Sequence, residues 1–117
     1  MITVYGIKTC QTCRKAMKWL EAEGIDARFH DVRADGLDAR KLDAWIGALG
    51  WEELLNTRGT TWRRLPEGET AVVDGARARE LMLAHPTLIK RPVFDLGNEI
   101  VIGFKPAQQQ KIRGALP

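Results

Sequence analysis

The chain has 117 residues, of which 44% are hydrophobic and 28% are charged, and its formal net charge is +3 at pH 7. This length and composition are typical of one soluble globular domain with its own core. Basic residues are scattered among acidic ones, so no nucleic-acid partner is predicted, and no apolar run approaches the roughly 20 residues of a membrane span. Because the chain begins directly with an apolar run and lacks a signal-peptide pattern, we expect a cytoplasmic protein with reduced thiols.

Both cysteines of the chain, Cys10 and Cys13, lie at one junction near the N-terminus. The apolar residues Ile2 and Val4 before them indicate a strand. The segment after them has helical periodicity, and Gly24 is suited to end that helix after about residues 11–23. A C-x-x-C pair between a strand and a helix is typical of thioredoxin-like redox sites.

The position of the cysteines also suits thiolate chemistry. A thiolate is the reactive form of cysteine, and free N–H groups and the dipole at a helix N-terminus favour an anion there. Lys8, Arg14 and Lys15 add nearby positive charge. The helical spacing places Cys13 on the inward face with Ala16, Met17 and Leu20, and Cys10 toward solvent. We therefore predict Cys10 as the attacking thiol and Cys13 as a candidate resolving thiol.

Three other interpretations of the cysteine pair remain open. Half of a zinc site is one, although His30 and His85 are the chain's only histidines and do not have zinc-finger spacing. A structural disulfide is another, although so small a loop gains little stability from cross-linking. Two inert core cysteines are the third, and this fits Cys13 better than Cys10. We favour the redox site and expect no metal.

The middle of the chain is expected to be largely helical. Residues 25–32 alternate as a second strand does, and a loop with Gly36 follows. Asp38 and Asp74 are suited to cap two helices, which end near Gly50 and His85. A further helical turn is expected over 51–55 and a polar loop over 56–64, while 71–73 is ambiguous.

The last part of the chain returns to strands. Residues 92–95 and 99–102 are short apolar runs separated by Leu96, Gly97 and Asn98, which predicts a hairpin. Pro106 is suited to begin a final helix with Ile112 and Leu116 on its apolar side. The order predicts an α/β fold: a single domain, 1–117, with a small mixed sheet and a helical insertion over 35–85.

Several stretches carry a family resemblance that covers essentially the whole chain. The chain resembles the arsenate reductase/Spx group of thioredoxin-fold proteins, and within it the YffB-like branch. The most specific match is the run Leu54–Arg63. The others are Tyr5–Cys10, Phe29–Asp31, Asp35–Leu37, Ile89–Pro92 and Gly103–Phe104.

The resemblance implies a thioredoxin-like, glutaredoxin-type mixed sheet with a helical insertion. It implies a nucleophilic Cys10 and a cis bond between Arg91 and Pro92 beside it. It also implies glutathione as co-substrate, since YffB-like proteins are thought to be glutathione-using thiol reductases. Candidate residues for holding substrate are Arg91, Pro92, Arg58 and Lys105, and Lys8 is a candidate for lowering the Cys10 pKa.

The chain departs from the glutathione-linked arsenate reductases, in which three arginines surround the cysteine. Only Arg91 matches outright: Lys105 stands at one arginine position, and Asn56 stands at another with Arg58 two residues further on. A tetrahedral oxyanion favours planar, bidentate donors, and lysine is a point charge. The departure disfavours arsenate as the substrate.

We expect a glutathione-linked thiol-disulfide oxidoreductase, and two alternatives accompany it. One is arsenate reduction with glutathione or glutaredoxin. The other is an Spx-like redox-sensing regulator that binds RNA polymerase, in which the C-x-x-C pair acts as a switch; YffB-like chains often lack the second cysteine. A monomer is compatible with the sequence, which leaves the oligomeric state open.

Overall fold

A computed structural model describes residues 2–115, which form two compact units: the described residues up to Asp35 with those from Arg91 onward, and Gly36–Lys90. The first unit contains β1 (Ile2–Gly6), α1 (Gln11–Ala22), β2 (Ala27–Asp31), β3 (Val93–Asp95), β4 (Ile100–Ile102) and α7 (Pro106–Ala115). The second contains α2 (Ala39–Leu49), α3 (Trp51–Leu54), α4 (Thr60–Arg64), α5 (Glu67–Thr70), α6 (Gly75–Ala84) and the short 3₁₀ helix η1 (Pro86–Leu88).

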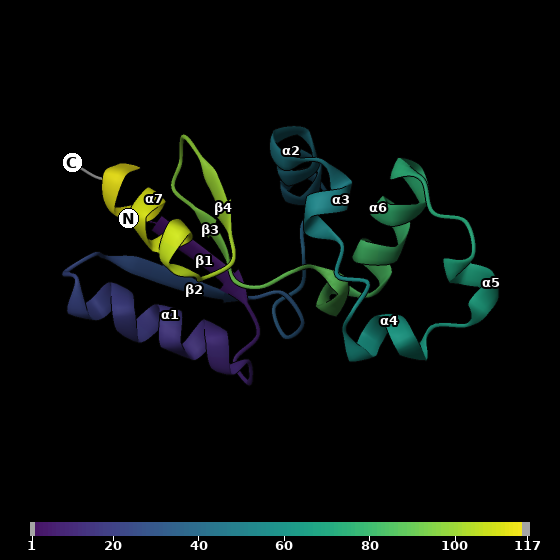
Figure 1. Ribbon diagram of the computed structural model, residues 1–117, viewed down its shortest axis with the longest axis horizontal. Coiled ribbons are helices and arrows are strands. Elements are labelled where there is room, and N and C mark those ends of the chain that lie inside the picture. Colours follow the sequence, from purple (N-terminus) through teal and green to yellow (C-terminus); the bar gives the residue numbers. More distant parts are fainter. Residues whose placement is uncertain (1, 116–117) are drawn as a thin grey trace. The chain divides into compact units, whose positions relative to one another are not determined.

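The first unit is a four-stranded mixed sheet in the order β2-β1-β3-β4 (Figure 1). Strand β2 is parallel to β1, whereas β3 is antiparallel to both β1 and β4. A parallel neighbour requires a crossover connection, which α1 supplies, and the antiparallel pair needs only the short turn after Asp95. The predicted mixed sheet and hairpin are confirmed, although the second strand begins at Ala27 rather than at residue 25.

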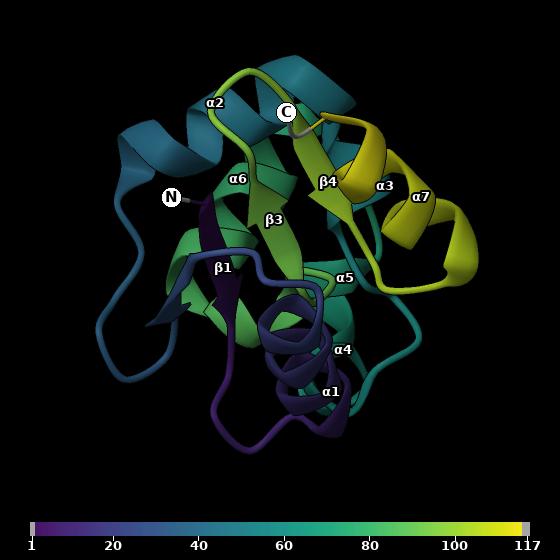
Figure 2. The same ribbon diagram turned by 90° about the vertical axis from the view of Figure 1, so that its left-hand side faces the viewer.

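A row of apolar side chains crosses all four strands on one face of this sheet. Val4 pairs with Phe29 on one side and Phe94 on the other, and Phe94 pairs with Val101. Helices α1 and α7 pack against this row, and Figure 2 shows them beside the strands. The buried residues of this core are Ile2, Val4, Ala16, Leu20, Phe94, Val101 and Ile112.

The boundaries of α1 follow from local backbone chemistry. Cys10 is its N-cap residue with extended dihedral angles, as the sequence predicts. At the other end Gly24 has a φ of +72°, a conformation that glycine adopts without the steric cost that other residues have. The N–H of Ile25 then bonds to the carbonyl of Leu20 at 2.9 Å, which leads the chain directly into β2. A short, hydrogen-bonded turn therefore connects the C-terminus of α1 to β2.

Helices α2 and α6 of the second unit begin at the predicted caps. The Asp38 side chain accepts a hydrogen bond from the N–H of Arg40 at 2.8 Å, and that of Asp74 accepts one from the N–H of Arg77 at 2.8 Å. Gly50, with a φ of +87°, ends α2 as expected. Each carboxylate satisfies an N–H group that the helix itself leaves without a partner.

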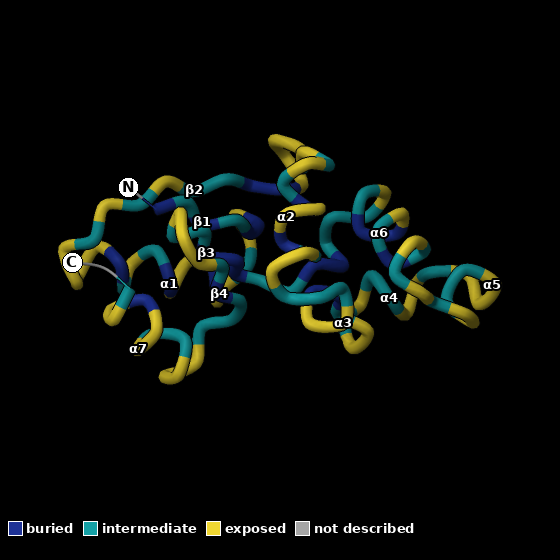
Figure 3. Tube along the Cα trace, turned by 90° about the horizontal axis from the view of Figure 1, so that it is seen from above, coloured by how far each residue is buried: buried dark blue, intermediate teal, exposed yellow. Residues whose placement is uncertain are grey.

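The prediction of a loop over 56–64 is wrong in its second half, because Thr60–Arg64 forms α4. The Thr61 hydroxyl is hydrogen-bonded to the Thr87 hydroxyl of η1 at 2.7 Å, a contact between residues 26 positions apart. Tertiary contacts of this kind override weak local propensity. The short helices α4 and α5 contain no buried residue and carry no dark blue in Figure 3.

Helix α7 begins at Pro106 and buries Ile112, as predicted, whereas Leu116 lies outside the described residues. None of the described helices has the length and apolar character that crossing a membrane would require.

Candidate active site

Cys10, the N-cap residue of α1, and Cys13, in the first turn of the helix, are both free thiols. The N–H of Cys10 donates to the carbonyl of Ile7 at 3.0 Å, and its carbonyl accepts from the N–H of Arg14 at 3.1 Å. Cys10 is half-buried and Cys13 is 1% exposed. The inward direction predicted for Cys13 is confirmed, and Cys10 is the more accessible thiol, although it is less open to solvent than expected.

The pKa of the Cys10 thiol is lowered below its ordinary value. Burial raises the pKa, but hydrogen bonding with the backbone and thiol of Cys13, hydrogen bonding with the Arg91 side chain and the positive charge of Arg91 together outweigh it. Neither Lys8 nor Lys105 is among the groups that lower this pKa. A thiolate at a helix N-terminus is stabilised in the same direction.

Burial, together with a smaller contribution from the neighbouring Cys10, raises the pKa of Cys13 to about 12. A hydrogen bond with the Ile7 backbone and the charge of Arg91 act in the opposite direction and are outweighed. The thiol packs directly on β1, since a Cβ atom placed on Gly6 would collide with the Cys13 Sγ. Cys13 is therefore a protonated, tightly packed thiol beside Cys10.

Asp31, at the end of β2, holds the turn that leads to Cys10. One carboxylate oxygen accepts from the N–H of Lys8 at 2.9 Å, and the other accepts from the N–H groups of Arg33 at 2.9 Å and Ala34 at 2.8 Å. These bonds, first that from Ala34 and then that from Lys8, lower the pKa of Asp31 despite its burial. Asp31 is 3% exposed, and a buried carboxylate with satisfied oxygens fixes its neighbours in place.

Sequence reasoning missed this role of Asp31. The only feature in the sequence that could have indicated it is an acidic residue at the end of an apolar strand. The same turn has two side-chain supports. Arg14 Nε donates to the carbonyl of Lys8 at 2.9 Å, and an Arg33 terminal nitrogen lies 3.4 Å from Thr9 Oγ1. The chain from Lys8 to Cys10 is thus tied to β2, the loop after it and α1.

The bond between Arg91 and Pro92 is cis, which confirms the expectation from the resemblance. Pro92 is buried, and its carbonyl accepts from the N–H of Gly103 at 2.9 Å. Arg91 precedes this anchored residue, and its side chain is hydrogen-bonded to the Cys10 thiol. The fold thus brings together the Cys10 thiol and the Arg91 guanidinium, which are 81 positions apart in the sequence.

Comparison with known proteins identifies the family. The model of the ArsC family matches residues 5–112. The chain belongs to the ArsC family. A protein of Haemophilus influenzae described as uncharacterized is 44% identical over 110 residues, which cover 94% of this chain and 96% of that one. A global transcriptional regulator Spx of Lactiplantibacillus plantarum is 27% identical, with 100% of this chain and 87% of the regulator covered.

Solved structures place the fold within the same family. The structure of the YFFB protein has a TM-score of 0.90 and 44% identity, with full coverage of both chains. An arsenate reductase (ArsC) related protein from Brucella melitensis has a TM-score of 0.76 and 52% identity, with 94% of this chain and 92% of that chain covered. The expected thioredoxin-like fold and the family resemblance are confirmed.

The remaining residues that ArsC-family resemblance suggested lie in two places. Arg58 is exposed in the second unit, where with Trp51 and Lys90 it lines a cavity of about 520 Å³. Its N–H donates to Asn56 Oδ1 at 3.0 Å. Lys105 is exposed before α7, and its N–H donates to the Gln108 side chain at 3.0 Å, a helix-capping bond. Their roles in binding substrate stay predictions.

The described residues contain no cluster of side chains suited to bind a metal ion, with or without the two histidines. Within residues 2–115, no group of three or more His, Cys, Asp or Glu side chains is arranged to hold a metal ion. The ring of His30 packs against Tyr5, with centroids 5.1 Å apart.

Proposed function

We propose that this ArsC-family protein is a glutathione-linked thiol-disulfide oxidoreductase with Cys10 as its nucleophile. The observation that carries the proposal is the half-buried Cys10 at the N-terminus of α1, whose pKa is lowered through hydrogen bonding with Cys13 and Arg91. Because the thiolate is the form that attacks a disulfide, a lowered pKa increases the reactive fraction at neutral pH.

In the first step the Cys10 thiolate attacks one sulfur of a disulfide or of a glutathionylated thiol. A new S–S bond forms between Cys10 and that sulfur while the old S–S bond breaks. The other sulfur leaves with the electron pair and takes a proton from water. No net oxidation occurs, since one disulfide is exchanged for another.

Glutathione is the better candidate for the second step. Its thiolate attacks the mixed disulfide, releases the Cys10 thiolate, and leaves with the substrate sulfur as a new disulfide. Cys13 is a poor resolving thiol, because burial raises its pKa to about 12 and leaves it almost fully protonated at neutral pH. Its proton serves better as a hydrogen-bond donor to the Cys10 thiolate.

Arg91 serves two purposes in this scheme. Its charge stabilises the Cys10 thiolate before attack. Its position beside the sulfur also suits the carboxylate of a glutathione molecule that approaches Cys10, since guanidinium groups bind carboxylates through paired hydrogen bonds. Lys105 and Arg58 are further candidates for the same carboxylates.

The test is turnover of a small disulfide such as hydroxyethyl disulfide with glutathione, NADPH and glutathione reductase. We expect Cys10→Ser to lose at least about 100-fold in rate, because an alkoxide is not available at neutral pH. Cys13→Ala is expected to retain most of the activity, since glutathione can resolve the intermediate. Absence of turnover by the native protein, or full turnover by Cys10→Ser, would sink the proposal.

A redox switch is the second candidate function. It is supported by the close Cys10 and Cys13 thiols and by the similarity to an Spx regulator over the whole of this chain. Mass spectrometry after treatment with oxidised glutathione separates the two. Addition of one glutathione at Cys10 supports the enzyme, whereas loss of two hydrogens through a Cys10–Cys13 disulfide supports the switch. Arsenate-dependent NADPH consumption in the same coupled assay would instead identify an arsenate reductase.

A further inference from the structure

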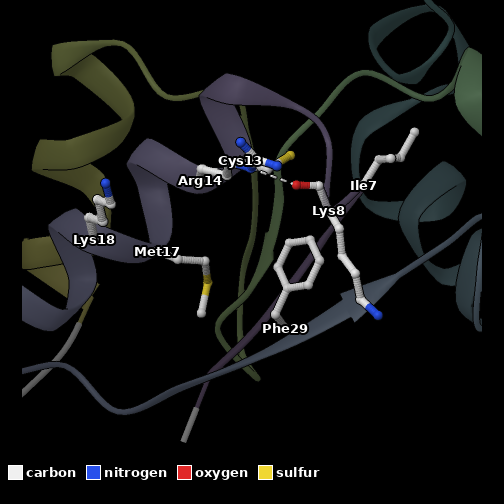
Figure 4. A pocket seen from close by; sticks show the side chains of 7 residues that line it. All are labelled: Ile7, Lys8, Cys13, Arg14, Met17, Lys18 and Phe29. Carbon is white, nitrogen blue, oxygen red and sulfur yellow. Dashed lines mark hydrogen bonds between the residues drawn. The ribbon is translucent and has the colours of Figure 1, made fainter.

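A cavity lies between α1 and β2 of the first unit, next to Cys13. It has a volume of about 330 Å³, and the apolar residues that line it are Ile7, Cys13, Met17 and Phe29 (Figure 4). We call it the α1–β2 groove. Its volume is at the low end of the roughly 300–1,000 Å³ of ligand sites, which is room for one or two apolar side chains.

Three cations line the same groove: Lys8, Arg14 and Lys18. No acidic side chain is among the described residues that line it. In the part of the chain that the structure describes, the ammonium groups of Lys8 and Lys18 have no ion-pair partner. Arg14 is fixed by its bond to the carbonyl of Lys8 at 2.9 Å. The groove is thus lined by both apolar and positively charged residues.

The positions of the cations indicate which kind of ligand would fit the groove. In Figure 4, Lys18 and Lys8 lie on opposite sides of the Met17 and Phe29 side chains. A ligand with one anionic head and one apolar tail would use only one of these ammonium groups. A chain segment with apolar residues between acidic ones would place carboxylates at both, with its apolar side chains against the apolar residues of the groove.

The location of the groove favours the same kind of ligand. Phe29 belongs to β2, which is an edge strand of the sheet, and extended peptides commonly bind along such edges. Cys13 lines the groove and is hydrogen-bonded to Cys10. The groove therefore borders the residue that contacts the reactive Cys10.

We infer that the α1–β2 groove binds an extended peptide segment in which apolar residues are flanked by acidic ones. Taken together with the proposed function, on which this last step rests, the segment belongs to a protein substrate and lies beside the disulfide that Cys10 attacks. Glutathione itself lacks the large apolar side chain that Met17 and Phe29 are placed to contact. The groove would thus select among protein disulfides and leave small ones to diffuse to Cys10.

The probe is a fluorescein-labelled peptide, Ser-Glu-Glu-Leu-Phe-Glu-Glu-Ser, and the readout is fluorescence anisotropy at low ionic strength. Binding is measured to the full chain carrying Cys10→Ser, so that no thiol chemistry contributes and failure of the redox proposal cannot affect the result. We expect saturable binding that weakens with added salt. Replacing the four glutamates by glutamine, or Leu-Phe by Ser-Gly, is expected to abolish most of it.

The decisive variant is Lys8→Gln with Lys18→Gln, for which we expect about fivefold weaker binding, the effect of losing two exposed ion pairs. The matched control is Lys15→Gln with Lys111→Gln, which removes the same charge from exposed positions outside the groove and is expected to bind as before. Circular dichroism checks that both variants fold.

Three outcomes would overturn the inference. The first is equal weakening by the groove and control variants, which would indicate attraction to net charge alone. The second is equal binding of the glutamine peptide, which would remove the role of the cations. The third is displacement of the peptide by millimolar glutathione or by laurate, which would assign the groove to a small thiol or a lipid carboxylate.

Discussion

Cys10, at the N-terminus of α1, and Cys13, on the inner side of its first turn, differ in both exposure and pKa. Cys10 is half-buried with a lowered pKa, whereas Cys13 is 1% exposed with a pKa raised to about 12. The difference arises because Cys10 is the extended N-cap residue, whereas Cys13 is a buried residue inside the helix. The comparison shows that a C-x-x-C pair need not contain two reactive thiols, because packing alone can make one of them a donor.

Gly6→Ala disturbs the packing of Cys13 and is expected to have the largest effect on stability. The added Cβ would collide with the Cys13 Sγ and lie 3.3 Å from its Cβ. Because β1 is central in the sheet and cannot move away easily, we expect the free energy of unfolding to fall by about 2–3 kcal/mol, a typical cost of overpacking. Urea denaturation measures the change.

Two further variants show whether the collision is the cause. In a Cys13→Ala background the cost of Gly6→Ala should fall by at least half, because the sulfur is gone. Gly47→Ala is the matched control: Gly47 is exposed within α2 with nothing within 4 Å of an added Cβ, and this change should raise stability by about 0.5–1 kcal/mol. An unchanged penalty without the sulfur would mean that Cys13 is not the packing partner.

The sequence predicted the fold of the first unit well because its signals are local. Strand periodicity, the helical spacing from Cys13 to Leu20 and the hairpin around Gly97 all depend on residues close in sequence. The segment Thr60–Arg64 was assigned wrongly because its helix is supported by the Thr61–Thr87 contact, which no local pattern encodes.

The same distinction applies to the candidate site. The position of Cys10 before α1 follows from a local motif, whereas its pairing with Arg91 was suggested only by family resemblance. The role of Asp31 was missed because its partners Lys8, Arg33 and Ala34 are backbone N–H groups, which look alike in every sequence. Lys8 was expected to lower the Cys10 pKa through its charge, which stays a prediction; what the structure shows is its N–H bound to Asp31.

Asp31→Asn tests the Cys10 side of the comparison with a smaller effect. The amide can still accept from Arg33 and Ala34, but its NH₂ group faces the N–H of Lys8, so one bond is replaced by two opposed donors. We expect a loss of about 1–2 kcal/mol at pH 7, measured by urea denaturation, since a buried donor is left unsatisfied. The turn before Cys10 should also become more susceptible to proteolysis.

The pH dependence of this loss has a definite sign. The pKa of Asp31 is lowered in the folded protein, so its carboxylate stabilises the fold at pH values above the ordinary aspartate pKa of about 3.9. The contribution disappears as the pH falls through the lowered value. The difference between native protein and variant should therefore be full at neutral pH and shrink in acid. Asp43→Asn, which removes an exposed carboxylate paired with Arg79, is the control and should change stability little.

Arg91→Gln is expected to have the smallest effect, on the rate at which Cys10 reacts with iodoacetamide. Removing the guanidinium removes one of the contacts that lower the Cys10 pKa, so the pKa rises toward its ordinary value and less thiolate is present at neutral pH. We expect alkylation at pH 7 to slow about threefold, within the ~0.2–1 kcal/mol of a solvent-accessible ion pair. At high pH both proteins are fully ionised, and the variant should react at least as fast, because a less stabilised thiolate is the better nucleophile. Lys105→Gln is the control: it removes the same charge from a residue that is not among the groups lowering this pKa, and the pH dependence of alkylation should stay unchanged. If the pKa of Cys10 does not move in Arg91→Gln, the lowered pKa is due to Cys13 alone.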